Sequence, residues 1–384
     1  MFRATALLFA SALAACTSPG TKPDAPLPTD AFDRRAMLAH LATNVLLPIQ
    51  ADVEASASRV APAILAYCEA LDTGTVGSTL DEARTALGVA IDSWQYADAV
   101  LVGPAAMNQN TIRDRVYAWP LFSPCEINKD IASHWASPSS YDVTTELVST
   151  RSLTAVEFLL YPPSDAHACL SPPAGWDTMP KDRARCRLAY VIASDVAQQA
   201  RALHTAWKPD GGNYIAELTG MSNPHAAVNI VSDSLFYMDK MVKDMKLGQP
   251  AGITMNACDA MQEPCVIEVE ARFADRATYA IRANLAATRR LFTGTTPDDD
   301  GPSFDDFLVA LGHEDVANRM VASLDDSIAK AALIPDSFLA ALSTGYSQIV
   351  ATHGATKAFT ADLKSQFLTL LALEIPDDVA TDND

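Results

Sequence analysis

The sequence lacks the histidine patterns that mark many zinc hydrolases. It contains seven histidines, none of which lies four residues from another or is followed by Glu three residues later. Histidines at that spacing, as in HExxH, would place two imidazoles on one helix face around a metal ion. The nucleophile motif GxSxG, the P-loop and a Cys–His catalytic signature are missing as well. The sequence therefore leans away from an enzyme.

Basic residues, strand signals and long apolar runs are also scarce. Lys and Arg number 28 against 47 Asp and Glu, which gives a formal net charge of −19. Such a chain does not bind nucleic acid through its net field. Beyond the N-terminus, no segment is apolar enough for a transmembrane helix. Only CVIEVEARF (265–273) is typical of a strand, and it could equally start a helix.

The N-terminus has the features of a secretory signal. Arg3 precedes a short apolar run that ends in LAAC, which resembles the lipobox of bacterial lipoproteins. An ordinary signal peptide with an incidental cysteine is the alternative. We expect a signal peptide over residues 1–15, then an acylated Cys16 and a flexible Pro-rich linker over residues 16–30. Because Asp does not follow Cys16, the sorting rule of this class indicates the periplasmic face of the outer membrane. The lipid would be the only membrane attachment.

Six cysteines remain if Cys16 is acylated, and an even number in an exported protein suggests disulfides. No two of them have the CxxC spacing of metal or redox sites. One pair brackets a turn-like insert and another brackets a Pro-rich loop, so each is expected to close its own loop. The third pair follows by elimination, although six cysteines permit many other connectivities. The expected disulfides are Cys258–Cys265, Cys169–Cys186 and Cys68–Cys125.

Helical periodicity dominates the rest of the chain. Over residues 78–101 apolar side chains recur at spacings of three, four and seven, and Thr79 with Glu82 reads as a capping box. Other amphipathic runs stop at Gly248, at Gly312 and before Pro209. These patterns predict an all-α protein of helix bundles. A change of composition near residues 207–218 predicts a domain boundary, and residues 376–384 form an acidic tail.

One carboxylate stands in an apolar stretch. Glu157 lies within LTAVEFLL (153–160), and an unpaired carboxylate is costly to bury. On a helix it shares a face with Thr150, Thr154 and Tyr161, whereas the apolar side chains lie opposite. The pattern therefore places Glu157 in a polar seam between helices.

The surroundings of Glu157 resemble a motif of the imelysin-like family, also classified as peptidase family M75. That family carries Gly-x-His-x-x-Glu, for which this chain has Ser152, Thr154 and Glu157. The order of other segments agrees with the family over roughly residues 36–371. These segments contain Trp94, Gly103-Pro104, Trp119-Pro120, KLGQP (246–250), Glu270, Asp275 and Asn284.

The resemblance implies two helical lobes, each built on an up-and-down four-helix bundle, over residues 31–208 and 209–375. It also implies an exported protein, a site in the cleft between the lobes, and partners in bacterial iron uptake. A metallopeptidase activity is attached to the family by name. The residues expected to line or support the site are Glu157, Thr154, Ser152, Arg115, Trp119, Trp94, Glu270 and Asp275.

The replacement of the motif histidine decides between the functions that the family suggests. A zinc peptidase needs about three protein ligands, and a Thr154 hydroxyl is a poor one. We therefore expect a non-catalytic binding component connected with iron acquisition. A metal-dependent peptidase and an interaction scaffold that has lost the family site are the alternatives.

The individual site residues keep alternatives of their own. Iron or another divalent cation could bind through Glu157 and Glu270, but no metal is assigned. Glu157 could instead form an ion pair, for which the candidate partners are Arg113, Arg115, Arg151 and Arg272, or it could simply face solvent. Core packing is the alternative role for Trp94 and Trp119.

Overall fold

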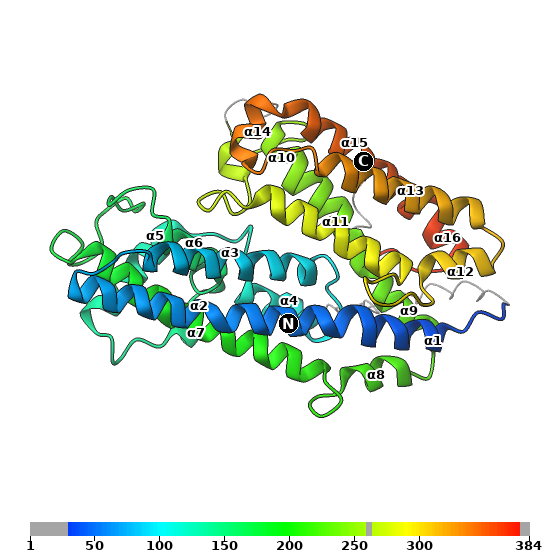
Figure 1. Ribbon diagram of the computed structural model, residues 1–384, viewed down its shortest axis with the longest axis horizontal. Helices are drawn as coiled ribbons and strands as arrows, with labels where there is room; N and C mark the ends of the chain where they lie inside the picture. The colour runs from blue at the N-terminus through cyan, green and yellow to red at the C-terminus, as the bar shows by residue number, and fades with distance from the viewer. Residues whose placement is uncertain (1–29, 259–262, 377–384) are drawn as a thin grey trace, which may run out of the picture.

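The computed structural model describes residues 30–258 and 263–376, and all regular elements in those ranges are helices (Figure 1). The predicted all-α fold is confirmed. The strand-like segment 265–273 holds only a short 3-10 helix, η7 (Val266–Glu268). None of the helices in the described ranges has the length and apolarity needed to cross a membrane. Cys16, the expected signal peptide and linker up to residue 29, and the tail from residue 377 lie outside the described residues.

The first group of helices is built around two long ones, α2 (Leu47–Thr73) and α7 (Lys181–Trp207), which pack along each other. Helix α2 also packs on α3 (Thr79–Asp98), and α7 packs on α6 (Leu153–Leu160). The chain enters α2 through α1 (Arg34–His40) and the π-helix η1 (Leu41–Leu46). The remaining elements are η2 (Gly103–Ala105), α4 (Met107–Val116), α5 (Pro124–Ala136), η3 (Val143–Thr145), η4 (Val148–Thr150) and α8 (Tyr214–Gly220).

A second group is built on α11 (Ala277–Thr293), α13 (Glu314–Ala331), α15 (Tyr346–Asp362) and the π-helix η6 (Met238–Gly248). Its core includes the packed rings of Phe292, Phe304, Phe359 and Phe367. The other elements are α9 (Pro224–Ser232), η5 (Asp233–Phe236), α10 (Gln249–Ala251), α12 (Phe304–Ala310), α14 (Phe338–Thr344), η8 (Leu363–Phe367) and α16 (Leu368–Leu371).

The two groups meet where α11 packs against α3 (Figure 1). Trp94, on α3, is fully buried, as its core-packing alternative expected. The division near residue 208 into two four-helix bundles stays a prediction.

The helix ends follow local chemistry, with two corrections. Ser303 caps α12 in a capping box with Asp306, as its position predicted. The hydroxyl at the start of α3 that bonds Glu82 belongs to Ser78, 2.6 Å away, and not to Thr79. The expected stop at Gly248 is also wrong, because the helix continues through α10 and ends at Gly252, whose φ of 69° suits glycine.

Three disulfides cross-link the chain, and two of them differ from the prediction. Cys258–Cys265 is confirmed, whereas the other pairs are Cys68–Cys186 and Cys125–Cys169. Cys68 lies near the end of α2 and Cys186 near the start of α7. Because these helices pack side by side, they bring together cysteines that are 118 residues apart. The prediction that each cysteine pair closes its own loop failed for these two pairs, because tertiary packing decides which cysteines lie next to each other.

Candidate functional site

The carboxylate of Glu157 is buried and bound by backbone amides. It lies on α6, all of whose residues are buried, and its own exposure is 1%. Its Oε1 accepts hydrogen bonds from the N–H groups of Phe273 and Ala274, both at 2.9 Å. The polar seam between helices is thus present. The donors come from the backbone of the segment before α11 and not from an arginine side chain, although the charge of Arg272 also favours the ionised carboxylate.

The segment that supplies these amides is a tight turn. Ala271 and Asp275 flank it with positive φ values of 44° and 51°, which turn its N–H groups toward a common point. Consecutive N–H groups in such a turn form a concavity that suits an anion. The Asp275 carboxylate accepts from the N–H of Leu339 at 3.3 Å. Asp275 therefore anchors the turn and does not join the seam.

Burial dominates the ionisation of Glu157. Desolvation raises its pKa to about 7, although the two backbone hydrogen bonds favour the charged form, and the nearby Glu270 raises it further. Tyr117 is also fully buried, and desolvation followed by the charges of Glu270 and Glu157 raises the pKa of its phenol. Near neutral pH, Glu157 can therefore hold or release a proton.

Glu270 belongs to a buried network that joins three helical elements. Lys246 of η6 lies with Nζ 3.0 Å from Glu270 Oε2, and Gln95 of α3 donates from Nε2 to Glu270 Oε1 at 3.0 Å. The same Nζ donates to Gln95 Oε1 at 2.6 Å and to Oδ1 of Asn284, on α11, at 2.8 Å. Burial lowers the pKa of Lys246, but Glu270 opposes this shift. The network ties the two helix groups at their interface.

A second buried ion pair lies beside the first. Arg113 donates from Nε to Asp98 Oδ1 at 2.9 Å, and Tyr237 donates its hydroxyl to Asp98 Oδ2 at 2.7 Å. Burial alone would favour a protonated Asp98, but Arg113 holds its pKa below the ordinary value. The sequence predicted Arg115 as a site residue. Arg115 is only half-buried and forms no ion pair within the described ranges. The neighbouring arginine takes that place.

The imelysin family model matches residues 46–366, well over half of the chain. The chain belongs to the imelysin family. An imelysin-like protein from Psychrobacter arcticum 273-4 is similar in structure, with a TM-score of 0.67 and 16% identity over 91% of this chain and 100% of that one. A protein from Parabacteroides distasonis ATCC 8503, provisionally named iron-regulated protein A precursor, has a TM-score of 0.66 and 16% identity over 90% and 97% of the two chains. No curated protein matches the chain.

The altered motif of this imelysin lies at the start of α6 and within it. Ser152 occupies the N-cap position of α6 but makes no side-chain capping bond. It is fully buried, and its Oγ accepts from the N–H of Ala118 at 3.2 Å. Thr154 is 4% exposed, and its hydroxyl has no hydrogen-bond partner among the described residues. Trp119 lies at the network, with its ring centroid 5.7 Å from Lys246 Nζ. Of the expected residues, Glu157, Trp119 and Glu270 make contacts at the interface.

The side chains at this interface do not fit a zinc or iron ion. Such ions take several deprotonated ligands, commonly His, Cys or carboxylate. In the described part of the chain, no three side chains of those types are placed to hold a metal ion. Glu270 is already paired with Lys246, and one Glu157 oxygen already accepts two N–H groups. The ammonium group would also repel a cation, so ligation by Glu157 and Glu270 is disfavoured.

Sequence reasoning missed the partners of the two glutamates. Lys246 and Lys243 lie in an amphipathic run in which lysine is usually solvated, yet both are buried. The π-helical geometry of η6 brings Lys246 to the interface, and the sequence carries no signal for that geometry. Gln95 follows Trp94 in a helix that was predicted from its apolar residues alone, so its polar side chain was not considered.

Proposed function

We propose that this chain is a non-catalytic imelysin of the bacterial cell envelope that acts as a binding component in iron acquisition. The observation that carries the proposal is the environment of Glu157. Its carboxylate accepts two backbone N–H groups at 2.9 Å and is 1% exposed. A general base must reach a water molecule beside the substrate. Here the carboxylate instead joins α6 to the turn before α11.

The neighbouring chemistry supports the same reading. A metallopeptidase needs a metal with an open coordination position. Thr154 stands where the family motif has its histidine, and Lys246 neutralises Glu270. Three surface cavities of about 340, 300 and 390 Å³ occur in the described part, and Glu157 lines none of these three. We assign this interface to the seam between two four-helix lobes. We infer that it holds the lobes together and does not serve as a catalytic centre.

The cellular setting rests on two separate lines of support. Three disulfides favour an oxidising, extracytoplasmic compartment. The similarity to the Parabacteroides protein, whose provisional name refers to iron regulation, supports a role in iron uptake. We add to this proposal the lipid anchor at Cys16 and the periplasmic face of the outer membrane, since the N-terminal motif resembles a lipobox.

The test compares growth and hydrolysis in one set of strains. Deletion of the gene in the source bacterium should slow growth only when iron is limiting, and the wild-type gene should restore it. The Glu157→Gln variant should restore growth too, because its amide oxygen can still accept the two N–H groups. Purified protein incubated with zinc or ferrous iron should cleave no peptide. Chelator-sensitive cleavage that disappears in Glu157→Gln would establish the peptidase alternative and refute the proposal.

A further inference from the structure

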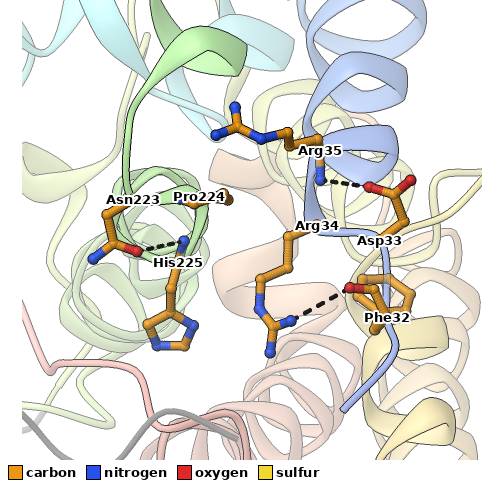
Figure 2. A pocket seen from close by; sticks show the side chains of 7 residues that line it. All are labelled: Phe32, Asp33, Arg34, Arg35, Asn223, Pro224 and His225. Carbon is orange, nitrogen blue, oxygen red and sulfur yellow. Dashed lines mark hydrogen bonds between the residues drawn. The ribbon is translucent and has the colours of Figure 1, made fainter. Parts of the chain in front are cut away.

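A cavity of about 340 Å³ lies at the opposite side of the first helix group from α6, between the starts of α1 and α9 (Figures 1 and 2). Arg34 and Arg35 line one side of it, and Asn223 and His225 line the other. Phe32 and Pro224 add apolar surface. Its volume is at the lower end of the range that small-molecule sites have, roughly 300–1,000 Å³. None of these residues belongs to the Glu157 interface.

His225 lines this cavity and carries a buried, unpartnered ring nitrogen. The side chain is 9% exposed, and its Nε2 lies 2.9 Å from the carbonyl oxygen of Ala372. Because a carbonyl only accepts, Nε2 carries the proton and Nδ1 of the neutral ring is an acceptor. Nδ1 is buried without a hydrogen-bond partner among the described residues. A buried acceptor without a donor is costly, so a ligand that donates to Nδ1 would be favoured.

Arg34 is held in place opposite this imidazole. Its Nη1 and Nη2 donate to the Asp30 carboxylate at 3.0 and 2.6 Å, and its Cζ lies 4.4 Å from the centroid of the Phe307 ring. Nη1 also donates to the carbonyl oxygen of Phe32 at 3.3 Å. Of the five N–H groups of a guanidinium, Nε–H and the second Nη2–H therefore remain available to an acceptor. Figure 2 shows the guanidinium of Arg34 and the ring of His225 facing each other across the cavity.

The acidic residues nearby are already engaged. Asp30 binds Arg34, and the hydrogen bonds from Arg34 lower the pKa of Asp30, although its burial opposes this. Asp33, which also lines the cavity, caps α1 through Oδ1, which accepts from the N–H groups of Arg35 and Ala36. The cavity therefore offers guanidinium donors on one side and an imidazole acceptor on the other. An anionic ligand suits it better than a cation does.

We propose that this cavity binds a small 2-hydroxycarboxylate. The ligand carboxylate accepts from the free N–H groups of Arg34, while its hydroxyl donates to Nδ1 of His225. Phe32 and Pro224 contact its carbon chain. The proposal needs neither the iron-linked role nor the Glu157 interface, so it stands or fails separately from the proposed function.

Calorimetric titration of the full mature chain at pH 8 tests this pairing, with L-malate and succinate as probes. Succinate matches malate but lacks the hydroxyl, so malate should bind at least about tenfold more tightly, which is the effect of one lost hydrogen bond. Arg34→Gln should weaken the binding of both malate and succinate. Lys330→Gln, on α13, is the matched control and should leave both affinities unchanged. Equal affinities for the two acids, or no binding of malate at millimolar concentration, would overturn the proposal.

His225→Gln gives the sharper variant. Its side-chain amide can still donate to the Ala372 carbonyl, but it offers no ring acceptor in place of Nδ1. The preference for malate over succinate should therefore disappear, while succinate binding remains. A preference that survives in the folded variant would also overturn the assignment. If circular dichroism shows that this variant does not fold, the comparison between malate and succinate in the wild-type chain decides the question.

Discussion

Glu157 shows how one side chain can be both buried and ionisable. Removing a carboxylate from water costs several kcal/mol, which is on the order of the net free energy of unfolding of a whole protein. Two backbone N–H groups offset part of that cost, yet desolvation still raises the pKa to about 7. The protonated acid keeps a carbonyl oxygen that accepts the same two hydrogen bonds. The junction between α6 and the turn at Ala271–Asp275 can therefore persist in either state.

The raised pKa predicts a measurable pH dependence of stability. Because the folded value of about 7 exceeds the reference value of 4.5, the folded state binds more protons between those pH values. The free energy of unfolding should fall as pH rises through that window, by about 3 kcal/mol for this group. Glu157→Gln, which mimics the neutral acid, should lack this component. Urea unfolding of both proteins at pH 5, 6, 7 and 8 measures the difference.

The comparison between variants isolates Glu157 from other acids. Burial also raises the pKa of Asp130 to about 7 and that of Asp305 to about 6, so both add to the pH slope of each protein. Their contributions cancel in the difference between wild type and Glu157→Gln. That difference should favour the variant increasingly as the pH rises from 5 to about 7, and should level off above the folded pKa of about 7. A difference that is constant from pH 5 to 8 contradicts the buried, near-neutral carboxyl.

Lys246 gives the second prediction at the residue scale. Lys246→Met leaves Glu270 buried without its cation, so it should lower the free energy of unfolding by about 3–5 kcal/mol. Adding Glu270→Gln removes the uncompensated charge and should recover at least half of the loss. Lys330→Met breaks an exposed pair with Asp326 and should cost under about 1 kcal/mol. Denaturant midpoints measure the stability of all three variants. If Lys246→Met lowered the free energy of unfolding by no more than the control Lys330→Met, the prediction would be wrong.

At the scale of elements, the disulfide between α2 and α7 should matter most. It closes a separation of 118 residues, whereas Cys258–Cys265 closes only 7. In the chain-entropy account, the longer loop contributes about 5 kcal/mol and the shorter about 2. Replacing Cys68 and Cys186 by Ser should therefore reduce stability more than replacing Cys258 and Cys265. Peptide mapping without reduction should find the Cys68–Cys186 pair, and finding Cys169–Cys186 instead would restore the loop-based prediction.

The helices were predictable from sequence because their signals are local. The apolar period of α3, the cap at Ser303 and the stop of α7 before Pro209 each act within a few residues. The interface was only partly predictable. The face of α6 indicated a polar seam at Glu157, but its partners lie more than 110 residues away, on a turn formed by residues with positive φ. Nothing in the sequence nearby specifies such partners.

The whole molecule combines an acidic surface with buried cations at its centre. Its formal charge is −19, yet Lys243, Lys246 and Arg113 are each at least 93% buried. The cations that remain outside are largely paired with nearby carboxylates, as Arg319 is with Asp362 and Arg289 with Asp325. An acidic surface gives no attraction to anionic headgroups, which bind clusters of Lys and Arg. The net charge therefore gives no electrostatic attraction to a membrane rich in anionic lipid.

The lipid anchor is tested by changing the residue that would carry it. Cys16→Ser should abolish labelling by radioactive palmitate and release the chain from the membrane fraction, because no helix of the described residues could replace the anchor. Ser18→Ala, two residues further, keeps the cysteine and should behave as wild type. Thr17→Asp should keep the lipid but move the protein to the inner membrane. Membrane retention of Cys16→Ser at the wild-type level would show that the attachment has another origin.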